Sequence, residues 1–163
     1  GDGYEKGKYF LPQLIMSAET AKSAFAAIQE FLSASGNTQE KKGKIIIATV
    51  QGDIHDIGKN IVKALLENYG FDVVDMGKDV PVMDIVDKVV EHDVQLLGLS
   101  ALMTTTVVNM EKTIKEVKKV KPDCKIMVGG AVLNQEYADE IGADFYGKDA
   151  LASVAYAQKV FAN

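Results

Sequence analysis

Cysteine is almost missing from this sequence, which contains one, Cys124, among 163 residues. A single thiol cannot form a disulfide within the chain, and no second cysteine is present to build a thiolate metal cluster. The sequence contains no run of about 18 apolar residues, which a membrane-spanning helix would need, and its first residues show no signal-peptide pattern. From these absences we expect a soluble protein of the cytoplasm with no membrane partner.

Positive charge is also scarce, because 18 lysine and arginine residues face 23 aspartate and glutamate residues, for a net charge of −5. A weakly acidic balance argues against a nucleic-acid partner. The lysines from Lys112 to Lys121 are interleaved with Glu111, Glu116 and apolar residues, which predicts a solvated helix face. The sequence has neither a G-x-G-x-x-G motif nor a Walker A lysine pattern, so a loop for nucleotide phosphates is not supported.

The first part of the chain differs from the rest. Apolar residues recur at helical spacing from Leu11 to Leu32, and Pro12 suits the first turn of such a helix. A polar stretch follows that is typical of a linker. We therefore predict a helical segment at residues 1–36, a linker at 37–43 and the main domain at 44–163.

Short apolar runs and helical patterns alternate from residue 44 onward. The expected strands are 45–50, 73–76, 96–100, 126–128 and 144–146, and the expected helices are 57–69, 83–91, 107–120, 135–141 and 150–161. This alternation predicts a parallel sheet with helices on both faces, and five strands favour the flavodoxin-like (Rossmann-type) order 2-1-3-4-5. Ligands of such sheets bind beyond the carboxyl ends of the strands, so the loops after the first, third and fourth strands are the candidate site.

His55 lies in the first of these loops, two residues after Asp53. A carboxylate at that spacing can orient an imidazole and raise the basicity of its free nitrogen, as it does for many metal-ligating histidines. A surface histidine without a special role explains the same pair. Gly129 and Gly130 follow the fourth strand, where they allow a bulky ligand to lie against the backbone or form a plain turn. Ser100 ends the third strand and could bind a ligand or cap the next helix.

Taken together, the three loops resemble a known family. The likeness is carried by Asp53-x-His55-x-x-Gly58, Ser100-x-Leu102 and Gly129-Gly130, which are similar to the DxHxxG…SxL…GG signature of cobalamin-binding domains. The longer string from Ile47 to Asn60 resembles cobalamin-dependent methionine synthase and the corrinoid proteins of methyltransferase systems.

The resemblance implies a bound cofactor, cobalamin (methylcobalamin) or a related corrinoid. In that family a histidine replaces the cofactor's own dimethylbenzimidazole as the lower ligand of cobalt, which gives this role to His55. Asp53 would orient His55, and Thr106 would complete a hydrogen-bond relay, while the displaced nucleotide tail enters a deep pocket in the sheet. The other cofactor contacts that the resemblance implies are Gly52, Ile54, Asp56, Gly58, Ser100, Leu102, Thr104, Gly129, Gly130, Tyr146 and Ala150.

The N-terminal segment resembles part of the helical cap that shields the upper cobalt face in the methyltransferase branch of this family. By that likeness Tyr4, Leu11 and Leu14 would contact the methyl site, although an ordinary helix-packing stripe explains the same residues. Only the last part of a full cap fits before residue 37. We therefore expect a truncated cap, whose exposed face could drive self-association into a homo-oligomer.

The function that follows is that of a carrier. The chain would shuttle a methyl group on cobalt between methyl-donor and methyl-acceptor methyltransferase subunits, with a reductive activase as a further partner. No nucleophile–base pair or second metal site is visible in the sequence, so we do not expect turnover by the chain alone. Two alternatives stay open: a sensory or mutase-type domain that binds adenosylcobalamin, and a flavodoxin-like interaction module without a cofactor.

Overall fold

The computed structural model describes residues 41–162 and, before them, Phe10, Gln13, Met16, Ser17, Thr20, Ser23 and Ala24. The chain divides into two compact units, Gly1–Glu40 and Lys41–Asn163. In the first unit every described residue after Phe10 is helical, and the hydroxyl of Ser17 donates to the carbonyl of Gln13 at 2.8 Å. The predicted cap contacts Tyr4, Leu11 and Leu14 lie outside the described residues, and the predicted boundaries at 36 and 43 stay predictions.

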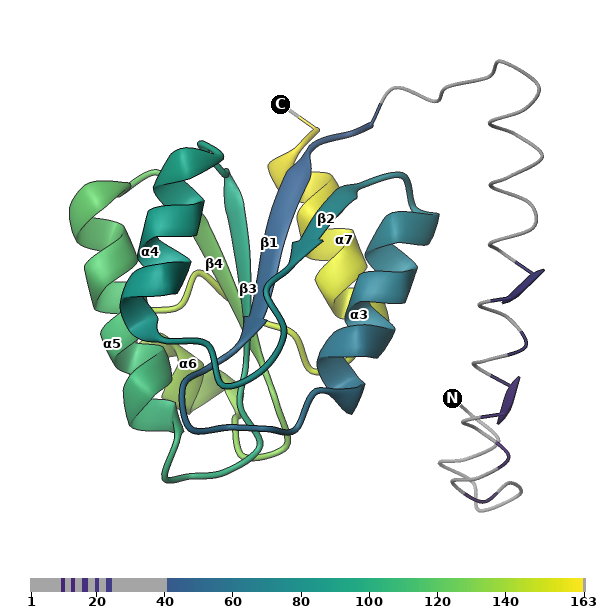
Figure 1. The fold of residues 1–163 in the computed structure, drawn as a ribbon, viewed down its shortest axis with the longest axis horizontal. Coiled ribbons are helices and arrows are strands. Elements are labelled where there is room, and N and C mark those ends of the chain that lie inside the picture. Colours follow the sequence, from purple (N-terminus) through teal and green to yellow (C-terminus); the bar gives the residue numbers. More distant parts are fainter. Residues whose placement is uncertain are drawn as a thin grey trace. The chain divides into compact units, whose positions relative to one another are not determined.

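The second unit is built on a five-stranded parallel sheet (Figure 1). Its strands are β1 (Lys44–Thr49), β2 (Asp72–Asp75), β3 (Leu96–Ser100), β4 (Lys125–Gly129) and β5 (Phe145–Tyr146). They lie in the order β2-β1-β3-β4-β5, so the predicted flavodoxin-like topology is confirmed. The carboxyl ends of β1 and β3 meet at the point where this order reverses, which is where such sheets bind ligands.

Four helices of this unit connect the strands, a fifth follows β5, and all five cover the sheet. They are α3 (Ile57–Asn68), α4 (Val82–Glu91), α5 (Val107–Val120), α6 (Gln135–Glu140) and α7 (Ala150–Val160). Helices α3 and α7 pack on one face, and α4, α5 and α6 lie on the other (Figure 1). None of the helices within the described ranges is both long enough and apolar enough to cross a membrane.

The core consists of two clusters, one for each face of the sheet. Strand β1 sends Ile46 and Ala48 to the α4–α5–α6 face and Ile45 and Ile47 to the α3–α7 face, as the alternation of side chains along a strand requires. The cluster on the α3–α7 face is the smaller one. In β3, Gly98 pairs with two members of this cluster, Ile47 on one side and Met127 on the other.

Candidate functional site

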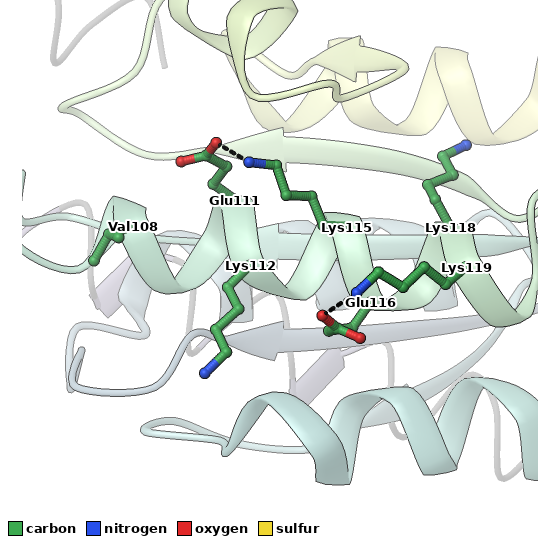
Figure 2. A pocket seen from close by; sticks show the side chains of 7 residues that line it. All are labelled: Val108, Glu111, Lys112, Lys115, Glu116, Lys118 and Lys119. Carbon is green, nitrogen blue, oxygen red and sulfur yellow. Dashed lines mark hydrogen bonds and ion pairs between the residues drawn. The ribbon is translucent and has the colours of Figure 1, made fainter.

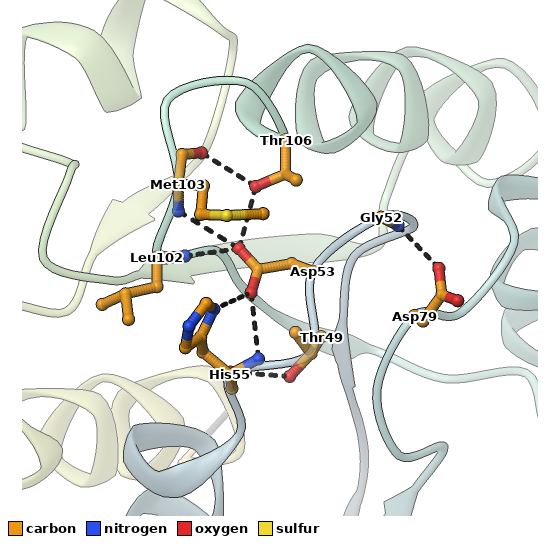
Figure 3. Close-up of polar contacts among 8 residues, drawn as sticks. All are labelled: Thr49, Gly52, Asp53, His55, Asp79, Leu102, Met103 and Thr106. Carbon is orange, nitrogen blue, oxygen red and sulfur yellow. Dashed lines mark hydrogen bonds and ion pairs between the residues drawn. The ribbon is translucent and has the colours of Figure 1, made fainter.

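A fully buried carboxylate organises the loop after β1. Asp53 has no exposed surface, and its Oδ1 accepts a hydrogen bond from the backbone N–H of His55 at 3.0 Å. The same oxygen lies 2.8 Å from Nδ1 of the His55 imidazole (Figure 3). Because the carboxylate is hydrogen-bonded to both the backbone and the ring of His55, it fixes the orientation of the imidazole. The pairing that the two-residue spacing predicted is therefore present.

The second oxygen of Asp53 binds the loop after β3. Its Oδ2 accepts from the backbone N–H groups of Leu102 and Met103 at 2.7 and 3.2 Å and from the hydroxyl of Thr106 at 2.8 Å (Figure 3). One side chain thus ties together the loops that follow the two central strands, β1 and β3. Thr106 contacts Asp53 directly, as the expected relay requires.

The protonation of this pair follows from its hydrogen bonds. Burial raises the pKa of Asp53, but the hydrogen bonds donated by the backbone of His55 and Leu102 and by the side chains of His55 and Thr106 outweigh it and hold the pKa well below the ordinary range. The carboxylate is therefore charged at neutral pH and acts only as an acceptor, so Nδ1 carries the ring proton of neutral His55. Its Nε2 then presents a lone pair, and no described residue forms a hydrogen bond to that nitrogen. The His55 side chain is 45% exposed.

A second aspartate, Asp79, braces the same loop from the β2–α4 connection. Its Oδ1 accepts from the N–H of Gly52 at 2.7 Å, and its own N–H donates to the carbonyl of Asp53 at 2.9 Å (Figure 3). Both Gly52 and Asp79 have positive φ angles, +86° and +53°. Sequence reasoning missed Asp79, and it placed Gly52 among the cofactor contacts, whereas the N–H of Gly52 faces Asp79.

A cavity of about 640 Å³ opens beside His55 at the carboxyl edge of the sheet and runs between α3 and α7. Ten of the expected contacts line it: Ile54, His55, Asp56, Gly58, Ser100, Leu102, Gly129, Gly130, Tyr146 and Ala150. Asp53 and Thr106 are buried and do not line the cavity; they form a hydrogen bond with each other beneath the loops that do. Thr104 is exposed, and neither it nor Gly52 belongs to the lining.

A deep pocket was expected, but the residues of its inner part were not predicted. Gly98 lines it together with Ile47 and Met127, the neighbours of Gly98 in the sheet, and Val62 of α3. A glycine in the interior of a strand often marks a place where a ligand approaches the backbone, and Gly98 interrupts the apolar run of β3. That interruption was the available sequence signal.

Lys59 is a further lining residue that sequence reasoning passed over. Its side chain is 3% exposed, and its Nζ lies 2.5 Å from Oδ1 of Asp75 and 3.0 Å from Oδ1 of Asn60. Burial raises the pKa of Asp75, but the hydrogen bonds from Lys59 and from the N–H of Gly77, with the charges of Lys59 and Lys63, leave it below the ordinary value. The pair fixes the first turn of α3 to the end of β2.

Position 130 requires glycine, because the backbone of Ala101 passes very close to it. Its φ is +144°, and a Cβ built there would lie 1.7 Å from the carbonyl oxygen of Ala101. The two glycines after β4 are thus not equivalent, since a Cβ at Gly129 would lie 3.4 Å from the nearest atom, the carbonyl oxygen of Gly147. Of the two sequence interpretations for Ser100, capping is wrong, because Thr106 occupies the N-cap position of α5.

A second hollow lies along α5, and it shares no lining residue with the cavity beside His55. Figure 2 shows that all of its lining residues come from this one helix: Val108, Glu111, Lys112, Lys115, Glu116, Lys118 and Lys119. Lys115 pairs with Glu111 and Lys119 with Glu116 along the helix, at 2.5 and 2.7 Å. The predicted solvated helix face is confirmed, and no second element supplies a wall for a ligand.

The fold and the site together define a class of protein. A parallel α/β domain with a cavity at the carboxyl edge of its sheet, and with an imidazole oriented by a buried carboxylate beside that cavity, is typical of domains that bind a small-molecule cofactor. Among the described residues, no cluster of three or more histidine, cysteine or acidic side chains could hold a metal ion by itself.

The chain belongs to the B12-binding domain family. A family model described as "B12 binding domain" matches residues 43–155, and a second model with the same description matches residues 1–29. The chain is 41% identical to dimethylamine corrinoid protein 1 of Methanosarcina acetivorans over 98% of this chain and 75% of that protein. It is 40% identical to dimethylamine corrinoid protein 3 of Methanosarcina mazei over 99% of this chain and 98% of the relative.

Solved structures give the same assignment. A cobalamin-binding protein from Desulfitobacterium hafniense matches with a TM-score of 0.78 and 34% identity, over 98% of this chain and 75% of that one. The methanol:cobalamin methyltransferase complex MtaBC from Methanosarcina barkeri matches with a TM-score of 0.74 and 33% identity, over 99% of this chain and 62% of that one. A response regulator at 15% identity, with a TM-score of 0.57, shares the fold alone. The predicted family and the predicted corrinoid cofactor are confirmed.

Proposed function

We propose that this chain is a corrinoid carrier that holds its cofactor base-off, with His55 as the lower cobalt ligand, and presents a methyl group on cobalt to partner methyltransferases. The observation that carries the proposal is the pair formed by Asp53 and His55. The buried carboxylate engages Nδ1 at 2.8 Å, so the opposite nitrogen, Nε2, is left as a ligand on a half-exposed ring.

The residues fit such a cofactor. Nε2 of a neutral imidazole is a common metal ligand, and a carboxylate on Nδ1 is its usual support. The cavity beside His55 has room for a displaced nucleotide tail, because Gly98 and Gly129 carry no side chains and Ser100 carries a small one. A bound corrinoid supplies a cobalt centre that accepts a methyl group and gives it up again.

The chain's own residues would act by positioning and by charge. Asp53 keeps the ring proton of neutral His55 on Nδ1, and the three donors from Leu102, Met103 and Thr106 hold the carboxylate in place. Because these donors come from a loop anchored by β3 and α5, the imidazole is held in one orientation before any ligand arrives. Pre-organisation of this kind reduces the entropy lost on binding.

The partners would be methyl-donor and methyl-acceptor methyltransferase subunits, with a reductive activase that restores the working oxidation state. Support comes from the similarity to the methanol:cobalamin methyltransferase complex MtaBC and to the dimethylamine corrinoid proteins. The N-terminal segment, with Tyr4, Leu11 and Leu14, is proposed as a partial cap, and homo-oligomerisation through it is part of the same proposal. A cytoplasmic location fits these partners.

The proposal is tested by electron paramagnetic resonance of the Co(II) form, with the chain labelled with ¹⁵N-histidine. We expect the nitrogen superhyperfine pattern to change on labelling, because the nucleus on cobalt belongs to the protein. A superhyperfine pattern that stays the same on labelling would show that the nitrogen on cobalt belongs to the cofactor's own base, and it would overturn the base-off, His-on proposal.

The chain offers a matched control, since it contains only two histidines. His92 is the C-cap residue of α4, and its side chain lies near Glu91 rather than in the cavity lining. The variant His92→Ala should retain the labelled pattern in full, whereas His55→Ala should lose it. If His92→Ala lost the labelled pattern and His55→Ala kept it, the cobalt ligand would be His92, and the proposed role of His55 would be wrong.

A further inference from the structure

The loop that carries Asp53 and His55 begins with a tight turn. The N–H of Asp53 donates to the carbonyl of Val50 at 3.0 Å, which closes a four-residue turn. The third residue of this turn, Gly52, has a φ of +86°, and a positive φ at that place is the mark of a type II turn. The central peptide, which joins Gln51 to Gly52, therefore has one of the two orientations open to it, because its reversal would give the type I form.

Two side chains hold this central peptide, one at its N–H and one at its carbonyl. The N–H, which belongs to Gly52, donates to Oδ1 of Asp79 at 2.7 Å (Figure 3). The carbonyl, which belongs to Gln51, accepts from Nδ2 of Asn109 at 2.7 Å. Asp79 comes from the connection between β2 and α4, and Asn109 comes from the first turn of α5. A reversed peptide would lose both hydrogen bonds, because its N–H and its carbonyl would exchange directions.

The same two elements also contact the residue that follows the turn. The backbone N–H of Asp79 donates to the carbonyl of Asp53 at 2.9 Å. At the start of α5, the hydroxyl of Thr106 donates to Oδ2 of Asp53 at 2.8 Å. The turn and the buried carboxylate are thus held by one framework, so a change in the turn moves the point from which the Asp53 side chain reaches His55.

We propose that Asp79 and Asn109 are positioning residues, which fix the turn before Asp53 so that its carboxylate meets Nδ1 of His55. The consequence for cobalt rests on the proposed function, whereas the effect on the imidazole does not need a cofactor. Without the two side chains the central peptide is free to reverse, and the contact between Asp53 and Nδ1 is loosened. The proton of the neutral ring then distributes over both nitrogens, because the hydrogen bond at one nitrogen sets the tautomer.

Nuclear magnetic resonance of the cofactor-free full chain, labelled with ¹⁵N-histidine, measures the position of this proton at a pH where the ring is neutral. We expect wild-type His55 to carry the proton on Nδ1. Asp79→Gly and Asn109→Ala should each move part of the population to Nε2, while His92 serves as the reference in the same spectra. Unchanged nitrogen shifts of His55 in either variant would overturn the role of the residue replaced.

Two further variants separate positioning from a general loss of stability. Asp79→Asn should keep the wild-type shifts, because its amide oxygen can accept from Gly52 and asparagine tolerates the positive φ of +53°. Asp93→Gly is the matched control: within the described part of the chain Asp93 is the other non-glycine residue with a positive φ, and its carboxylate pairs with Lys121 at 2.6 Å. An effect of Asp79→Asn as large as that of Asp79→Gly, or an equal effect of Asp93→Gly, would contradict positioning through the turn.

The consequence for cobalt is measured by titration of cobinamide, a corrinoid without a nucleotide base. Loss of a carboxylate that directly supports a metal-ligating histidine costs about 10–100-fold in affinity, and Asp79 acts one contact further away, so we expect Asp79→Gly to bind several-fold more weakly. Equal affinity would overturn the role in ligation. If the ring proton moves but wild type shows no labelled Co(II) pattern, the carrier proposal fails and the clamp stands. A labelled pattern with an unmoved proton refutes the clamp alone.

Discussion

Replacement of Gly130 by alanine should destabilise the domain by an amount that can be worked out from one contact. The new Cβ would lie 1.7 Å from the carbonyl oxygen of Ala101, roughly half of a normal separation, at a φ of +144° that side chains rarely adopt. The backbone strain alone costs about 1–3 kcal/mol. Relief of the overlap requires the loop after β3 to move by more than an ångström.

That movement reaches the site, because the residues after Ala101 hold the buried carboxylate. Leu102 and Met103 donate their N–H groups to Asp53 at 2.7 and 3.2 Å, and weakening one hydrogen bond to a charged group costs about 1.5–3 kcal/mol. We therefore expect Gly130→Ala to lower the free energy of unfolding by about 3–5 kcal/mol, a large part of the total for a domain of this size. A substitution at Gly130 tests folding more than it tests entry to the cavity.

Urea unfolding of the cofactor-free chain, followed by circular dichroism, measures this loss as a lower midpoint at an unchanged slope. Gly58→Ala is the matched control, because a Cβ at Gly58 meets no atom within 4 Å and the residue lies in the first turn of α3. That variant should keep or slightly raise the stability, since alanine is the better helix former. A free energy of unfolding for Gly130→Ala within about 0.5 kcal/mol of the wild-type value would refute the reasoning from the 1.7 Å contact.

Two further predictions concern charge. The pKa of Asp75 is lowered in the folded chain, so its contribution to stability is present above the ordinary aspartate pKa of about 3.9 and is lost as the pH falls through the lower folded value. Urea unfolding of wild type and Asp75→Asn from pH 6 to about pH 3 should show a gap between them that narrows below about pH 4, and a constant gap would contradict the ion pair with Lys59. Burial raises the pKa of Cys124 to about 11, so iodoacetamide at about pH 8 should label this thiol slowly in the folded chain and readily in urea; rapid labelling of the folded chain would contradict its burial.

The secondary structure was predictable because each element has its own local pattern. A β-branched run predicted β1, and helical spacing predicted α5. In both cases the predicted bounds lie within one residue of the observed ones. The pair of Asp53 and His55 was predictable for the same reason, since two residues of one loop carry it. Asp149 caps α7 through its own side chain, because its carboxylate accepts from the N–H of Ala152 at 2.7 Å.

Contacts between distant segments were not predictable from residue types. Asp79 reaches Gly52 across 27 positions of the sequence, and nothing in its own neighbourhood indicates that partner. The N–H groups of Leu102 and Met103 are main-chain donors, which every residue but proline possesses, so no side chain marks them as partners of Asp53. Gly98 needed knowledge of its neighbours in the sheet before its missing side chain could be understood as part of a cavity.

The unequal filling of the two faces of the sheet has a consequence for motion. Helices α3 and α7 rest on the smaller cluster and border the cavity of about 640 Å³, so less apolar contact opposes their separation from the sheet. Amide hydrogens in α3 and α7 should therefore exchange with solvent through local opening, whereas those in β3 should exchange only when the whole domain unfolds. A ligand in the cavity would supply the packing that this face lacks, and it would slow exchange in α3 and α7 more than elsewhere. In this respect the cofactor completes the core as well as the site.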